Sequence, residues 1–123
     1  MDENTRTPGK TTISPDVILT IARLTTLEVE GVSRLSPAPP RMDQFFKKTQ
    51  SEGVHLEIAD NLVNADIYVV MENDVNIREV SRNIQKAVSR AVSKMVGMEV
   101  GKINIHIEDI DFNDKENNEE AQP

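Results

Sequence analysis

The sequence predicts an α/β fold of the α+β type, a two-layer sandwich in which two helices cover one face of a small mixed β-sheet. Residues 76–97 form a long amphipathic helical pattern, residues 54–71 form two apolar runs around a turn, and residues 103–107 alternate again. Each expected helix and strand is apolar on one side only, which favours two layers around one shared core. The predicted element order is α-β-β-β-α-β.

The first helix is expected to begin at Ser14-Pro15-Asp16. Ser14 offers an N-cap oxygen, Pro15 fits the first helical position, and an acid there is favoured by the helix dipole. Gly31 is placed to accept the left-handed backbone that commonly ends a helix, and residues 32–35 are expected to form a short strand. The expected buried face consists of Val17, Ile18, Ile21, Leu24 and Thr25.

Residues 36–52 are predicted to be a proline-rich loop, because three prolines there oppose regular structure. The loop also contains Phe45 and Phe46 between basic residues. These rings either fold back onto their own domain, because burying phenylalanine is favourable, or contact a partner groove or a membrane interface. They are therefore candidate partner-binding residues.

A β-hairpin is predicted around Asp60-Asn61. A two-residue turn there pairs apolar residues with apolar residues across the two strands, whereas a slip by one residue would mix polar and apolar partners. The same register places His55 opposite Asp66 on the other face of the sheet. The expected apolar pairs are Val54 with Ile67, Leu56 with Ala65, and Ile58 with Val63.

The long helix is expected to be capped by Asn76 and closed by Gly97. A strand, a helix and a further strand favour a right-handed crossover, so residues 62–71 and 100–108 should be parallel neighbours. The apolar arc of the helix contains Ile77, Val80, Ile84, Ala87, Val88, Ala91, Val92 and Met95.

Five cations recur at every fourth residue on the opposite side of this helix. We call them the basic ridge: Arg78, Arg82, Lys86, Arg90 and Lys94. Three interpretations remain open: a solvated helix face, a docking surface for an anionic partner, and a contact with the acidic C-terminal end. Nucleic acid or anionic lipid is the alternative anion, but aromatic residues make up only 3% of the chain, which leaves few platforms for base stacking.

Composition limits both chemistry and organisation. The chain has 123 residues, no cysteine and a net charge of −7, which excludes disulfides, thiolate nucleophiles and cysteine-based metal sites. No signal-like start and no run of roughly 18 apolar residues appears, so no membrane span is expected. We expect a flexible tail over residues 1–12, one domain over residues 13–112, and an acidic disordered tail over residues 113–123.

No catalytic, cofactor or metal site is predicted. His55, Asp66, His106 and Glu108 fall on one outward sheet face, where a metal or proton-relay site is conceivable. Alternation alone places polar residues there, so a hydrated sheet face is the preferred interpretation. The serines of the long helix have no histidine at a useful spacing and no glycine-rich phosphate loop is present, which favours a non-enzymatic protein.

Several ordered blocks carry a family resemblance. They are residues 13–18 (ISPDVI), 27–32 (LEVEGV), 66–70 (DIYVV), 75–77 (VNI) and 103–107 (INIHI). Together they resemble the alkaline shock protein family of bacterial envelope stress response proteins. The resemblance implies a small cytoplasmic, non-enzymatic protein of cell-envelope homeostasis. It also implies self-association into homo-oligomers and, in some members, tethering to the membrane by a partner protein. It implies no catalytic residue and no cofactor.

Overall fold

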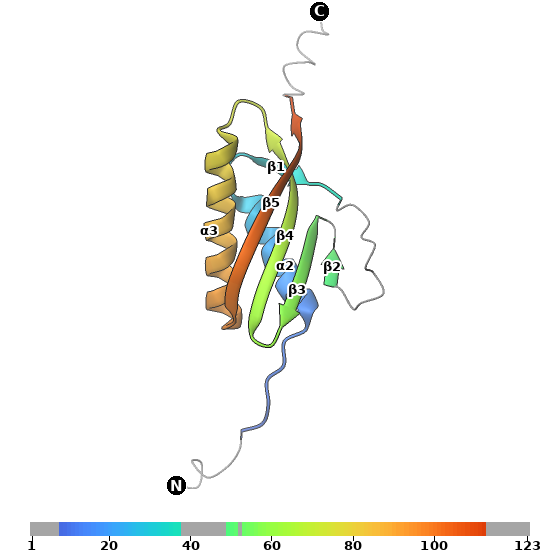
Figure 1. Cartoon of the computed structure of the whole chain (residues 1–123), viewed down its shortest axis with the longest axis vertical. Helices are drawn as coiled ribbons and strands as arrows, with labels where there is room; N and C mark the ends of the chain where they lie inside the picture. Colours follow the sequence, from blue (N-terminus) through green and yellow to red (C-terminus); the bar gives the residue numbers. More distant parts are fainter. Residues whose placement is uncertain (1–7, 38–48, 52, 113–123) are drawn as a thin grey trace, which may run out of the picture.

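The computed structural model describes residues 8–37, 49–51 and 53–112, and it confirms the expected fold class. Two helices lie on one face of a five-stranded sheet (Figure 1). The elements are α2 (Pro15–Glu28), β1 (Val32–Leu35), β2 (Thr49–Ser51), β3 (Val54–Ala59), β4 (Leu62–Glu72), α3 (Ile77–Val96) and β5 (Glu99–Asp111). The element order differs from the expected one by β2.

Strand β2 corrects the prediction that residues 36–52 form only a loop. Thr49–Ser51 pair antiparallel with residues 54–56 of β3, around Gly53 at φ 78°. Three residues are too few to produce a recognisable alternation, so no sequence period could have indicated this strand. Phe45 and Phe46 lie outside the described residues.

Strand β4 is the centre of the sheet. Along one edge it pairs in parallel with β5 over its whole length. Along the other edge its first half pairs antiparallel with β3 and its second half with β1. The parallel pairing of β4 and β5 across α3 was predicted from the strand–helix–strand order, and it is confirmed.

The hairpin register is confirmed at every predicted pair, including His55 opposite Asp66. Asp60 adopts φ 55°, a left-handed conformation that aspartate tolerates better than most residues. The apolar face of the hairpin therefore points into the core and contributes Val54, Leu56, Val63, Ala65 and Ile67.

Helix α3 agrees closely with its sequence pattern. Asn76 accepts a hydrogen bond from the Glu79 amide, and Gly97 closes the helix in the left-handed region. The residues of the expected arc that are buried are Val80, Ile84, Val88 and Val92. Met95 is exposed, because it lies in the last turn.

Helix α2 is rotated relative to the expected orientation. Ser14 caps it as predicted, but the helix ends at Glu28, two residues before the expected position, and Val29 is its C-cap. Val17 and Leu24 were expected in the core but are 47% and 50% exposed. The helix carries more apolar positions than one face can bury, so packing decided which arc is inside. The buried residues are Ile18, Leu19, Ala22 and Thr26.

Gly31 lies in the turn between α2 and β1, at φ 103°. A Cβ atom there would lie 2.7 Å from Cγ2 of Val80 on α3. The glycine thus permits a backbone conformation that L-residues avoid and a close approach of the turn to α3.

Candidate functional site

The basic ridge lies along the solvent side of α3, opposite its buried arc. All five side chains are exposed. None of them forms an ion pair with another residue in the described part of the chain. Because successive ridge residues are four apart, each cation lies roughly 40° further around the helix, so the ridge crosses the helix diagonally. Such a surface can contact several anionic groups at once.

A polar pair lies on the outer face of the sheet, where sequence reasoning had placed it. The carboxylate of Asp66 lies 3.0 Å from Nε2 of His106, and the side-chain amide of Asn104 donates to the same oxygen over 3.1 Å. The imidazole of His106 also stacks on the ring of Tyr68, with centroids 4.4 Å apart and planes 14° apart. These contacts join β4 to β5 and hold the imidazole against the sheet.

The outer face differs from the hydrated surface that was expected. His55 is 1% exposed, and Tyr68 and Val70 are also buried. Glu108 is exposed and has no partner opposite on β4, because the register shifts between Ile107 and Asp109. The alternation of β3 and β4 identifies the side of the sheet on which a residue lies, but it carries no information about what covers that side.

The arrangement gives no support to a metal centre. Within residues 8–37, 49–51 and 53–112, no group of three or more histidine, aspartate or glutamate side chains could hold a metal ion. A shallow hollow of about 480 Å³ on the outer face is lined by residues of mixed charge. They are Glu57, Leu62, Asn64, Asp66, Gly101, Lys102 and Asn104.

A second hollow, of about 360 Å³, lies between α3 and the edge of β5. It is lined by Gln85, Lys86, Ser89, Gly101 and Ile103, and so it includes one member of the basic ridge. The side-chain amide of Gln85 donates to the backbone carbonyl of Ile103 over 2.9 Å, which fixes this part of α3 against β5.

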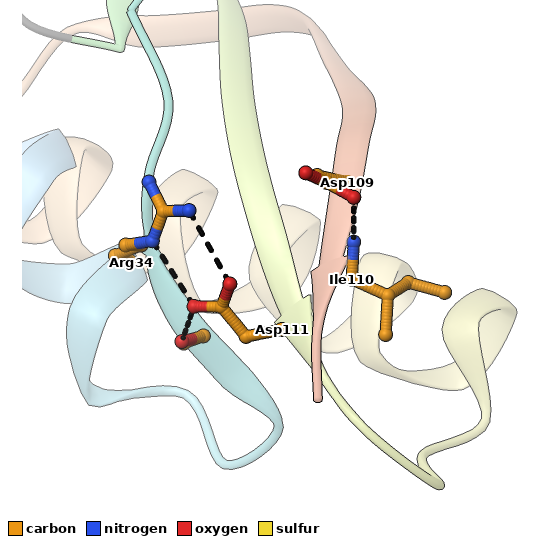
Figure 2. Close-up of polar contacts among 5 residues, drawn as sticks. Arg34, Asp109, Ile110 and Asp111 are labelled. Carbon is orange, nitrogen blue, oxygen red and sulfur yellow. Dashed lines mark hydrogen bonds and ion pairs between the residues drawn. The ribbon is translucent and has the colours of Figure 1, made fainter. Parts of the chain in front are cut away.

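Arg34 and Asp111 form an ion pair across the end of the sheet (Figure 2). Nε of Arg34 donates to Oδ2 of Asp111 over 3.0 Å and Nη2 donates to Oδ1 over 3.3 Å, while the Ser33 hydroxyl donates to Oδ2 over 2.7 Å. The hydrogen bonds from Arg34 and Ser33 lower the pKa of Asp111, and the bond to Asp111 raises the pKa of Arg34. The contact links β1 to the end of β5, and we regard it as a structural contact and not as a binding site.

The comparison with known families matches residues 3–112 to the model of the alkaline shock protein 23 family, which is described by a cell envelope-related function. The chain belongs to this family. The resemblance found in the ordered sequence blocks is thereby confirmed, and the coarse functional assignment is one related to the cell envelope.

Two relatives of this alkaline shock family protein have substantial identity. The uncharacterized protein YqhY of Bacillus subtilis (strain 168) is 32% identical over 117 residues, covering 94% of this chain and 87% of that protein. The uncharacterized protein Spy1535 of Streptococcus pyogenes serotype M6 is 40% identical over 103 residues, covering 83% of this chain and 79% of that protein. Each match covers at least 83% of this chain.

Among solved structures, a MamM CTD chain has a TM-score of 0.49 with 11% sequence identity. The match covers 78% of this chain and 99% of that one, and the likeness concerns the fold alone. Within the described part of the alkaline shock family protein, none of the helices combines the length and the apolar character required to cross a membrane.

Sequence reasoning identified the ridge and the Asp66–His106 face but missed two features. The Arg34–Asp111 pair joins residues 77 apart in the sequence, and no local pattern could have indicated it. The hollow beside β5 was also missed, although the exposed Gly101 within an expected strand was a signal, because glycine in a strand often marks a close approach of backbone.

Proposed function

We propose that this protein is a non-enzymatic interaction module of cell-envelope homeostasis that binds an anionic partner protein through its basic ridge. One observation carries the proposal. Along the 20 residues of α3 the five cations are exposed, and none forms an ion pair within the described residues. The chain as a whole has a net charge of −7, so this positive surface is locally distinct.

The geometry of the ridge favours an extended acidic surface as its ligand. From Arg78 to Lys94 the ridge spans about 25 Å, and Glu79 is the one acid within that segment. Individual exposed ion pairs contribute little, but several formed together can steer and hold a partner of opposite charge. Binding of this kind weakens as salt screens the charges.

We further propose that the protein acts in the cytoplasm, associates with the membrane through its partner, and forms homo-oligomers. These three statements follow from the family resemblance, and the ridge is compatible with them. Binding of nucleic acid or anionic lipid by the ridge is the alternative, and it is an outcome of the experiment below.

The test is affinity capture from the native cell at low salt, with wild type beside the triple variant Arg82→Ala, Lys86→Ala, Arg90→Ala. We expect the wild type to recover an acidic partner protein and the ridge variant to lose it. The matched control is Lys10→Ala, Arg23→Ala, Lys102→Ala, which removes the same charge away from the ridge and should retain the partner.

Capture that is unchanged in the ridge variant would contradict the proposal. Capture that is lost after nuclease treatment, or binding to vesicles containing phosphatidylglycerol that depends on the ridge, would favour the alternative ligand instead. Circular dichroism should show that the ridge variant keeps the fold, because exposed charges away from packed contacts rarely change stability by more than about 0.5 kcal/mol. The control variant is measured in the same way, because its Arg23 is partly buried.

A further inference from the structure

The outer edge of β5 has backbone groups that the sheet does not use. Within the described residues, β5 pairs only with β4 and is 13 residues long. Both backbone groups of Tyr68 face the opposite edge of β4, where its amide donates to Gly53 and its carbonyl accepts from Ser36.

The N–H and C=O groups of successive residues in a strand point alternately to one edge and to the other. Because those of Tyr68 point away from β5, the backbone groups of Ile67 and Val69 on β4 point toward β5. In the observed parallel register, the β5 residues whose backbone groups point back toward β4 are Asn104 and His106. The N–H and C=O groups of Ile103, Ile105 and Ile107 therefore point to the outer edge of β5, on the side opposite β4.

Two side-chain contacts agree with this assignment. The amide of Lys102 points toward β4, where it donates to the side-chain oxygen of Asn64. The carbonyl of the next residue, Ile103, accepts from Gln85 on α3. The hollow of about 360 Å³ lies at this point, with Gly101 and Ile103 on one side and α3 on the other. An added strand would occupy that space.

The α3 side of the hollow carries polar and basic side chains. Lys86 lines it, and Gln85 marks the side of α3 that faces β5. With 100° per residue, Arg78 and Arg82 lie within roughly 60° of Gln85 around the helix, on the same side. Both are exposed. Cations of the N-terminal half of α3 thus border the outer edge of β5, which has no paired strand among the described residues.

We propose that the outer edge of β5 accepts an extended, acidic segment of a partner protein, which adds to the sheet as a sixth strand with its acidic side chains against α3. Backbone hydrogen bonds supply affinity in such strand addition, and the side chains beside the edge supply selectivity. The inference rests on the proposed function and specifies the conformation and register of the ligand.

Charge distinguishes this partner from a second copy of the chain. Pairing of two β5 edges around a two-fold axis would bring one α3 alongside the other. Arg78, Arg82 and Lys86 of each copy would then face the same cations of its partner, and like charges at close range oppose association. An acidic strand meets the same cations with favourable charge.

The test uses the full 123-residue chain and a fluorescent peptide of alternating valine and glutamate. We expect the peptide to raise fluorescence anisotropy at low salt. An otherwise identical peptide, N-methylated at alternate amides, keeps the charge but cannot pair with the edge. It should bind at least about tenfold more weakly, because several backbone hydrogen bonds are lost.

Two readouts on the protein locate the peptide. The amides of Ile105 and Ile107 should gain protection from hydrogen exchange when the peptide is bound, because they face the outer edge. Arg82→Gln should weaken binding severalfold. Lys10→Gln removes the same charge at an exposed position outside the basic ridge, and it should leave the affinity unchanged.

Each contrary outcome overturns a separate statement. Equal affinity for both peptides, or no peptide binding, would refute strand addition while leaving the capture experiment with the ridge variant to decide the proposed function. A dimer in sedimentation velocity that the alternating peptide dissociates would assign the edge to a second copy and refute the acidic partner.

Discussion

Arg34 on β1 holds both carboxylate oxygens of Asp111 at the end of β5, although 77 residues separate the two in the sequence. The strands that carry them flank β4 on opposite edges. The ion pair therefore crosses the end of the central strand β4 and connects β1, the first strand in the sequence, to β5, the last.

The first prediction concerns the pH dependence of this pair. The hydrogen bonds from Arg34 and Ser33 lower the pKa of Asp111 in the folded state. A carboxylate with a lowered folded pKa stabilises the fold above its unfolded pKa, about 3.9, and this contribution is lost as pH falls through the folded pKa. NMR titration should show that Arg34→Gln raises the pKa of Asp111. Arg23→Gln is the control, because Arg23 forms no ion pair within the described residues, and an equal shift in both variants would refute the assignment.

The second prediction concerns the orientation of α2. Ile18 is 2% exposed and its neighbour Val17 is 47% exposed. Ile18→Ala should reduce the free energy of unfolding by about 2–5 kcal/mol, since it leaves a cavity in the core. Val17→Ala should cost less than about 1 kcal/mol. Urea unfolding measures both free energies. Equal losses of stability in the two variants would contradict the observed orientation of α2.

The third prediction concerns the turn after α2. Gly31→Ala combines a positive φ with a Cβ atom 2.7 Å from Val80, whereas Gly97→Ala has a positive φ with no atom within 4 Å. Both variants bear the cost of the left-handed backbone. Gly31→Ala should be less stable than Gly97→Ala by about 1–3 kcal/mol of overpacking. Thermal unfolding of the two variants side by side would contradict this if their midpoints coincided.

The fourth prediction concerns the stacked rings of Tyr68 and His106. Aromatic pairs contribute about 0.5–1.5 kcal/mol beyond the area that they bury. A double-mutant cycle of Tyr68→Leu and His106→Leu should therefore give a coupling free energy of that size in urea unfolding. A cycle of Tyr68→Leu with Lys10→Ala provides a pair without contact and should give none. Additive losses in the first cycle would mean that the stacking contributes nothing to stability.

Much of the fold could be predicted because its signals are local. The caps at Ser14 and Asn76, the hairpin register and the parallel crossover each depend on a few neighbouring residues or on the order of elements, and all are present. The exposed ridge also followed from helical spacing. Strand β2 did not, because its three residues are held by pairing with β3 and not by a pattern of their own.

The amino-acid sequence by itself determined the type and order of nearly all the elements, the faces of α3 and the strand alternation, because periodicity and capping act within one element. Tertiary structure alone decided which of two apolar arcs of α2 is buried, that Arg34 meets Asp111, and that Gln85 lies against the Ile103 carbonyl beside the outer edge of β5. These features depend on how separate elements pack and on the direction of each peptide group, and a linear pattern does not encode either of them.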